Sequence, residues 1–131
     1  MRLRDWQLRL AEFSQARASM PFDWGSNDCC TFTADAVHAM TGRSVREEFP
    51  SYDGETGALR AIAAGGGLQQ LASNILGDPV SPRMAAVGDV VLVLNAGREM
   101  MGICNGTSVL APGKCGIELV GMETALAAWR V

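Results

Sequence analysis

The chain has 131 residues, of which 48% are aliphatic, aromatic or cysteine and 19% are charged. This is the size of one domain, and it carries enough apolar residues to bury a core. The net charge of −3 and the scattering of the 11 basic residues argue against a nucleic-acid or anionic-membrane partner. No stretch approaches the roughly 18 apolar residues of a membrane span, and charges interrupt the N-terminus, so we expect neither a span nor a secretory signal.

We expect a single domain over residues 1–131. Its parts would be an N-terminal helix within 1–20, a mainly helical half over 21–80 and a mainly β half over 81–131. In the first part, apolar residues recur at intervals of three and four between charged ones, at Leu3, Trp6, Leu10 and Phe13. This spacing predicts an amphipathic helix over 3–17.

A second, buried helix follows the break "MPFDWGS". Three good N-cap residues, Ser26, Asn27 and Asp28, precede an apolar run from Cys29 to Met40, and a glycine stands at position 42. Ser, Asn and Asp accept hydrogen bonds from the free N–H groups of a first turn, and glycine favours the left-handed end of a helix. The two adjacent cysteines of "NDCC" therefore lie in the first turn.

The rest of the chain changes from helical to β character. Two short helices are predicted over 55–64 and 68–76, followed by a loop rich in Pro and Gly. Short β-rich runs separated by Gly or Asn turns then predict strands at 90–94, 101–104, 107–111 and 116–120. We expect a last helix in "METALAAW" (122–129) and a final edge strand in "WRV". The fold class is α+β, with helices packed on one side of a small antiparallel, partly barrel-like sheet.

Three blocks of sequence occur in a familiar order: "NDCCTF" at 27–32, "VGDVVLVL" at 87–94 and "MMGICNG" at 100–106. Together they resemble the NlpC-type cell-wall peptidases, papain-like cysteine peptidases and amidases that cut peptidoglycan stem peptides. The resemblance implies a papain-like NlpC-type fold. It also places Cys29 in the nucleophile position, with a histidine before Gly-Ile on the second strand as the base.

A narrower resemblance rests on "PFDWGSNDC", "MTG" and "AWRV". These strings are similar to small NlpC-like proteins that are encoded among bacteriophage tail genes, near the tail tip and the central hub. The resemblance implies synthesis in the bacterial host cytoplasm and a place in the virion tail. Its implied partners are other tail proteins, with peptidoglycan as a further one.

Two of the three catalytic roles of the family have unsuitable residues in this sequence. Met100 stands where the family has its histidine, and Leu110 lies near the third position, which usually orients that histidine. A thioether cannot take up a proton at neutral pH, and a leucine cannot orient a base. Cys29 keeps the advantage of a helix N-terminus, whose free N–H groups and partial positive charge favour a thiolate.

No other residue replaces the missing base convincingly. His38 is the only histidine and lies nine residues after Cys29 on the same predicted helix. That spacing places it on the opposite side and about 13 Å along the axis. Glu99 and Asp89 are carboxylates, which would repel a thiolate and raise its pKa.

All four cysteines are expected to be thiols, because an adjacent pair and two distant residues do not resemble a disulfide framework. For Cys29 the alternatives are a small residue buried at a helix start, a vestigial reactive thiol, and a nucleophile completed from outside the chain. Cys30 and Cys104 are expected in the core. The spacing from Cys104 to Cys115 fits no zinc motif, and we expect no metal, iron–sulfur cluster or other cofactor.

Two functional hypotheses remain. The first is a catalytically degenerate NlpC-like domain that acts as a structural or interaction component of a phage or prophage tail tip. Its partner surface would include Trp24, Met100 and Met101, since methionines adapt to varied contacts. The second is an active cysteine endopeptidase or amidase acting on peptidoglycan, with Cys29 as the nucleophile and a base from outside the usual motif.

Overall fold

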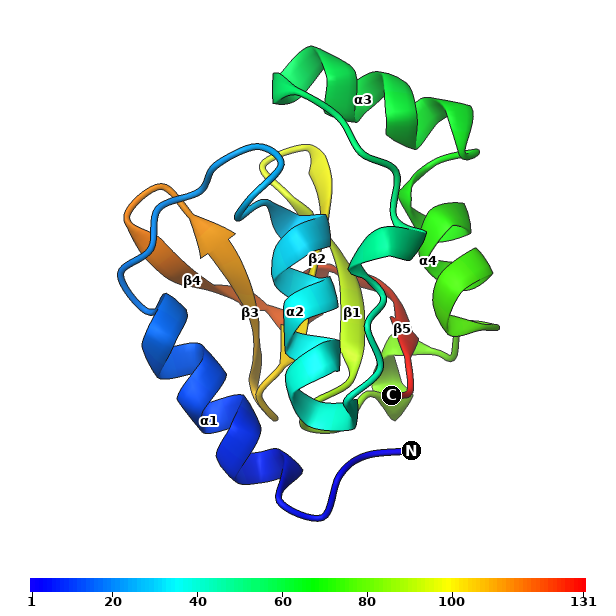
Figure 1. The fold of residues 1–131 in the computed structure, drawn as a ribbon. Coiled ribbons are helices and arrows are strands. Elements are labelled where there is room, and N and C mark those ends of the chain that lie inside the picture. The colour runs from blue at the N-terminus through cyan, green and yellow to red at the C-terminus, as the bar shows by residue number, and fades with distance from the viewer.

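Four helices precede a five-stranded sheet in the computed structural model, which describes residues 1–131 (Figure 1). The helices are α1 (Trp6–Arg17), α2 (Cys29–Thr41), α3 (Gly54–Ala64) and α4 (Leu68–Leu76). The strands are β1 (Val90–Asn95), β2 (Arg98–Cys104), β3 (Ser108–Gly113), β4 (Gly116–Gly121) and β5 (Ala125–Trp129). Single 3-10 turns occur at Arg46–Glu48, Pro82–Met84 and Met122–Thr124. The α+β class is therefore confirmed.

The sheet is open and entirely antiparallel, in the order β4-β3-β2-β1-β5. It does not close into the partly barrel-like form that we expected, because β4 and β5 are separate edges. Close contact between β2 and β3 requires a glycine at position 102, where a Cβ atom would lie 2.2 Å from the carbonyl oxygen of Leu110. This contact explains the glycine of the "GI" block in physical terms.

The last predicted helix is wrong. Residues 122–129 form a 3-10 turn and then β5, which pairs with β1 through registers such as Val90 with Trp129 and Leu92 with Ala127. Met, Glu, Leu and Ala are good helix formers, but intrinsic propensity is a weak preference that tertiary pairing overrides. Here β1 offers a free edge, and burial of Trp129, which is fully inaccessible to solvent, adds to the pairing.

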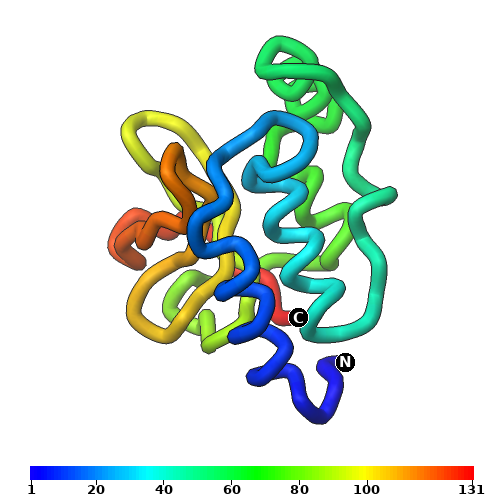
Figure 2. Tube along the Cα trace, turned by 60° about the vertical axis from the view of Figure 1, so that its left-hand side comes forward, coloured from blue at the N-terminus to red at the C-terminus, as the bar shows by residue number.

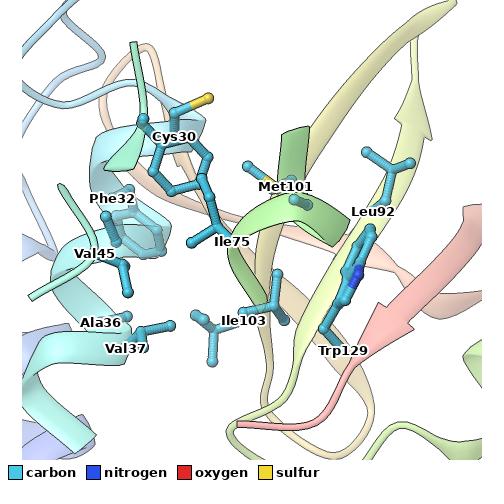
Figure 3. Packing of buried hydrophobic residues seen from close by; sticks show 14 of the residues in the cluster. Cys30, Phe32, Ala36, Val37, Val45, Ile75, Leu92, Met101, Ile103 and Trp129 are labelled. Carbon is cyan, nitrogen blue, oxygen red and sulfur yellow. The ribbon is translucent and has the colours of Figure 1, made fainter. Parts of the chain in front are cut away.

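The main core lies between α2 and one face of the sheet (Figure 3). Phe32 and Val37 of α2 face Met101 and Ile103 of β2, while Trp129 closes the layer from β5. A smaller cluster covers the other face of the sheet and contains buried residues of all five strands. Because α2 is held against β2 by this core, its first turn has a defined position relative to the strands.

The helix ends follow the sequence signals closely. Asp28 is the N-cap of α2, and Gly42 takes the left-handed conformation, with φ of +78°, at its C-cap. The helices expected over 55–64 and 68–76 correspond to α3 and α4. The first helix begins later than predicted, at Trp6, because the main-chain N–H of Leu3 donates to the Met40 carbonyl instead, at 2.8 Å.

The two chain ends lie close together in both views (Figures 1 and 2). The Arg2 side chain joins them by donating to the carbonyl of Val131 and to the Asp89 carboxylate, the latter at 2.8 Å. The longest helix, α2, has 13 residues, and none of the helices combines the length and the apolar character that a membrane span requires.

Candidate functional site

Cys29 is the first residue of α2, and a capping box fixes the turn that carries it. The Thr31 N–H donates to the Asp28 carboxylate at 2.9 Å, and the Asp28 N–H donates to the Thr31 hydroxyl at 2.9 Å. Two further donors, the Gly25 N–H at 2.9 Å and the Tyr52 hydroxyl, satisfy the other carboxylate oxygen. Asp28 is only 1% exposed, so this turn is held from inside the protein.

The environment of the Cys29 sulfur favours a thiolate. A hydrogen bond from the Cys30 thiol is the largest influence and lowers the pKa of Cys29. Burial of the thiol raises the pKa of Cys29. The main-chain N–H of Met101 lowers this pKa, and the negative charge of Asp28 raises it. The net effect is a Cys29 pKa below the ordinary value. The thiolate is the nucleophilic form of cysteine, so this arrangement favours reactivity.

Cys30 has the opposite role in the pair. It is 2% exposed and belongs to the main core, as expected. Its hydrogen bond to Cys29, together with burial, raises the pKa of the Cys30 thiol. Cys30 therefore remains protonated and can donate a hydrogen bond to the Cys29 sulfur. The sequence alone did not indicate this role of Cys30.

Cys29 is half-buried and opens onto a cavity of about 220 Å³. The cavity lies between the loop before α2, the helices α3 and α4, and the strands β1 to β3. Its walls are mostly apolar or aromatic, with polar groups contributed by the β1–β2 hairpin. The lining residues are Phe22, Trp24, Cys29, Leu59, Ile62, Leu68, Asn95, Arg98, Glu99, Met100 and Pro112.

Met100, the residue in the histidine position of the resemblance, lines the same cavity as Cys29. Its sulfur accepts a weak hydrogen bond from the Asn95 side-chain amide at 3.6 Å. Met100 and Cys29 therefore contribute to the walls of one cavity. Asn95, which donates this bond, was not among the predicted site residues, and its place at the end of β1 offered no signal for it.

Leu110, which the resemblance places near the third position, does not line the cavity. It pairs with Ile103 in the sheet and packs against the main core. The residue of β3 that does line it is Pro112, two positions further on. Neither a leucine nor a proline side chain can orient a base.

The other candidate bases lie in different places. His38 is exposed near the end of α2, four residues before the C-cap, and is not part of the cavity. Asp89 is 3% exposed and is paired with Arg2 at the start of β1. Glu99 does line the cavity, although its side chain is exposed to solvent. It is the one carboxylate among the lining residues.

The proposed partner surface needs a correction. Met101 has no exposed area and packs in the main core, because it points toward α2 rather than toward solvent. Trp24 is half-buried, stacks edge-to-face on Phe22 with ring centroids 4.7 Å apart, and lies 5.8 Å from the Arg98 guanidinium. Trp24 and Met100 remain at the cavity, and the exposed side chain of Leu59 joins them.

The remaining cysteines are free thiols that lie apart from the pair. Cys104 is buried on β2, where its sulfur accepts from the Gly106 N–H at 3.3 Å, and Cys115 is exposed in the turn between β3 and β4. No group of three His, Cys, Asp or Glu side chains is arranged to hold a metal ion.

A larger cavity of about 320 Å³ is lined by Cys30 and Tyr52 but not by Cys29. The single charged pair among its lining residues is Arg46 and Glu47, and Arg46 is already bound to Asp35 at 3.1 Å. With Cys30 held as a thiol, this cavity contains no reactive group. The smaller cavity at Cys29 is therefore the better candidate site.

The fold and the site define an α+β protein in which a cysteine at the start of a buried helix opens onto an apolar cavity beside an antiparallel sheet. The chain belongs to the family described as Domain of unknown function (DUF6950), whose model matches residues 1–131. No curated protein matches the chain at a significant level. The description of the family names no activity, so the function has to be inferred from the site.

Proposed function

We propose that this protein is a catalytically degenerate NlpC-like domain of papain-like architecture. In this proposal it is a structural or interaction component of a phage or prophage tail tip and binds other tail proteins, after synthesis in the bacterial host cytoplasm. The ordered blocks that carry Cys29, Asp89 and Gly102 support the resemblance on which the tail assignment rests.

The observation that carries the proposal is the pairing of Cys29 with Met100 in one cavity. Amide cleavage by a thiolate requires a general acid that protonates the leaving amine and a base that activates water, and imidazole usually supplies both. A thioether can do neither. Cys29 therefore keeps the position of a nucleophile without the group that would complete the reaction.

Residues beside the cavity supply a contact surface for a partner. Trp24 and Leu59 are partly or largely exposed there, and Arg98 adds a cation that is already shared with Glu55 at 2.7 Å. Aromatic and apolar side chains next to a guanidinium are enriched at protein interfaces. This composition supports binding rather than catalysis.

A second candidate function, a cysteine endopeptidase acting on peptidoglycan, is favoured by one specific observation. The pKa of Cys29 is lowered by the Cys30 thiol and the Met101 N–H, as an active nucleophile requires. Glu99 is the only lining residue that could act as a base.

Incubation of the isolated chain with purified peptidoglycan separates the two candidates. We expect no release of muropeptides from the wild-type protein, and none from Cys29→Ser. Release by the wild type that disappears in Cys29→Ser would overturn the degenerate assignment and establish the peptidase.

Replacement of Met100 by histidine tests the papain-like arrangement itself. In Met100→His an imidazolium beside the sulfur should lower the pKa of Cys29 further, because an opposite charge at close range favours the thiolate. The pH profile of iodoacetamide alkylation at Cys29 should move to lower pH in Met100→His and should stay in place in Met100→Gln. Equal profiles for both variants would contradict the assigned geometry.

The assembly role has its own test. Virions purified from the phage that encodes the chain should contain the protein in a fixed ratio to the other tail proteins, and antibody labelling should place it at the tail tip. A protein found only in the host lysate and absent from purified virions would contradict the assignment.

A further inference from the structure

Helix α3 is attached to the rest of the protein by few apolar contacts. It buries a single residue, Ala58, whereas α2 buries seven. Among the apolar side chains of α3, only the partly buried Ile62 packs against the main core. In both views α3 lies at the periphery of the molecule, whereas α2 lies against the sheet (Figures 1 and 2). Elements with few buried contacts open at a low cost in free energy, so α3 can move while the core stays intact.

Glycines with unusual backbone angles stand at both ends of α3. Gly54 begins the helix with φ of +65°, and Gly66 and Gly67 follow it with φ of +88° and +103°. No heavy atom lies within 4 Å of the place that a Cβ atom would take at Gly54 or Gly67, so close packing does not restrain the chain there. Domain and loop hinges are a few residues at the ends of elements that absorb large changes in φ and ψ. Glycine adopts the widest range of these angles, so both ends of α3 are suited to act as hinges.

The chain is fixed immediately outside these glycines. Before α3, the Tyr52 hydroxyl donates to the buried carboxylate of Asp28. After α3, Leu68 is only 2% exposed and belongs to the main core. Helix α3 is therefore a stiff segment between two hinges, and each hinge lies beside a fixed point of the fold.

One polar contact joins α3 to the body of the protein. Arg98 of β2 donates to the carboxylate of Glu55, in the first turn of α3, at 2.7 Å. No other side chain of α3 takes part in a hydrogen bond or an ion pair. Both partners are more than half exposed, so the pair is weak and is screened by salt. A contact of this strength can break and form again readily.

Helix α3 also forms one wall of the cavity at Cys29. Leu59 and Ile62 line the cavity from α3, and Trp24 lines it from the loop before α2. Arg98, which holds Glu55, lines the same cavity. Movement of α3 away from the hairpin would remove this wall and widen the path from solvent to the Cys29 sulfur.

We propose that α3 is a lid over the Cys29 cavity, with the flanking glycines as its hinges and the Arg98–Glu55 ion pair as its latch. The structure shows the lid closed. In the open position the apolar wall of α3 moves away from Cys29, while α2 and the sheet keep their places. Access to the cavity is then set by one exposed ion pair and responds to ionic strength. This inference goes beyond the proposed role in assembly and does not depend on it.

Thiol reagents of two sizes can report the position of the lid. The protein is the full chain with Cys115→Ala, which removes the exposed thiol. N-methylmaleimide is the small reagent and fluorescein maleimide the bulky one, and mass spectrometry maps the modified peptide. Both reagents react by the same chemistry, so the ratio of their rates at Cys29 does not depend on the pKa of the thiol. We expect the bulky reagent to be the slower one, because it needs an open lid.

Substitutions at the latch should change this ratio. Glu55→Gln removes an exposed ion pair and should raise the ratio of bulky to small labelling by roughly two- to fivefold. Glu55→Arg places two guanidinium groups together and should raise it further. The combination of Glu55→Arg with Arg98→Glu restores opposite charges and should return the ratio toward that of the wild type. Asp5→Asn, in the exposed pair of α1, is the matched control and should leave the ratio unchanged.

Salt gives a measurement that needs no substitution at the latch. An increase from about 0.01 M to about 1 M shortens the Debye length from roughly 30 Å to 3 Å. It should raise the ratio in the protein with an intact latch and leave it unchanged in Glu55→Gln. A ratio that responds neither to Glu55→Arg nor to salt would overturn the proposal. Labelling of Cys104 as fast as Cys29 would also overturn it, because Cys104 is buried in the sheet and reacts only when the whole domain unfolds.

Discussion

Two buried aspartates compensate their charges in different ways. Asp89, before β1, receives the Arg2 guanidinium at 2.8 Å and the Ala86 N–H at 2.9 Å. Asp28, before α2, receives only neutral donors, among them the N–H of Gly25 and the hydroxyl of Tyr52. The first aspartate is neutralised by a cation within a closed network that joins the chain ends. The second is solvated by dipoles beside two thiols.

The difference separates stability from chemistry within one small fold. Breaking a buried ion pair strongly destabilises a protein, because the remaining buried charge then has neither water nor a charged partner around it. Arg98 lines the cavity of Cys29 but is paired with Glu55, and the pKa of Cys29 is lowered by hydrogen bonds from Cys30 and Met101 rather than by a cation. The contacts of Asp89 should therefore contribute most to the stability of the fold, whereas the contacts of Asp28 should affect the reactivity of the Cys29 thiol.

Removal of the cation at the Asp89 end should have the largest effect. In Arg2→Ala the Asp89 carboxylate stays buried without its charged partner, and the bonds from Arg2 to the carbonyls of Val87 and Val131 are lost. We expect a loss of about 3 kcal/mol or more in the free energy of unfolding, measured by urea denaturation. Arg4→Ala, which removes an exposed arginine, serves as the control and should change stability little. Equal effects of the two substitutions would contradict the comparison.

Removal of the carboxylate at the other end should cost less. Asp28→Ala removes the N-cap bond to Thr31 and leaves the Tyr52 hydroxyl without its acceptor. The expected loss is about 2 kcal/mol, again from urea denaturation. Asp53→Ala is a matched control, because Asp53 is the N-cap residue of α3 but makes no side-chain capping bond. If Asp53→Ala lowered the free energy of unfolding as much as Asp28→Ala, the capping bond of Asp28 would not be the cause of its effect.

The Tyr52 hydroxyl should make a smaller, pH-dependent contribution. Tyr52→Phe removes one hydrogen bond to Asp28 and should cost about 1 kcal/mol at neutral pH. Burial, followed by the bond to Asp28, raises the pKa of Tyr52 above its usual value of 10. A raised pKa means that the unfolded chain ionises first, so this contribution is complete below pH 10 and is lost as the pH rises through the folded-state pKa.

Denaturation between pH 7 and pH 11 checks this sign. The wild type should lose stability more steeply than Tyr52→Phe once the pH exceeds about 10. Parallel curves for the two proteins would mean that the phenol is not buried in the way the hydrogen bond to Asp28 requires.

The exposed ion pair that joins α3 to the β1–β2 hairpin should have the smallest effect. Arg98 and Glu55 are each more than half exposed, at 56% and 52%, so Arg98→Gln should change the free energy of unfolding by about 0.5 kcal/mol or less. Hydrogen exchange should become faster in α3, which buries only Ala58, and should stay unchanged in α2. Arg9→Gln, at the exposed pair with Asp5 on α1, is the matched control and should leave α3 unchanged.

The start of α2 was predictable because its signals are local. Asp28 caps the helix, Gly42 ends it, and the apolar run between them has helical length, so neighbouring residues decide the structure. The strand at 90–94 was predictable for a similar reason, because its β-branched residues follow a glycine and an aspartate. Assignment of Met100 to a site with Cys29 came from motif resemblance, and both residues line one cavity.

Features that depend on distant segments could not be read from the sequence. Residues 122–129 carry helix formers, and only the free edge of β1 turns them into β5. Met101 looked like a surface residue beside Met100, but alternation along β2 directs it into the core against α2.

The α+β class could be predicted from the order of helical and β-rich runs along the chain, and the capped turn that carries Cys29 from neighbouring residues. The sequence also shows directly that position 100 is a methionine and not a histidine. Three features became visible only in the folded chain: α3 forms a wall of the cavity, Cys30 and Met101 lower the pKa of Cys29, and Arg2 pairs with Asp89. These contacts join residues far apart in the chain or depend on side-chain directions that packing selects, and no local pattern specifies them.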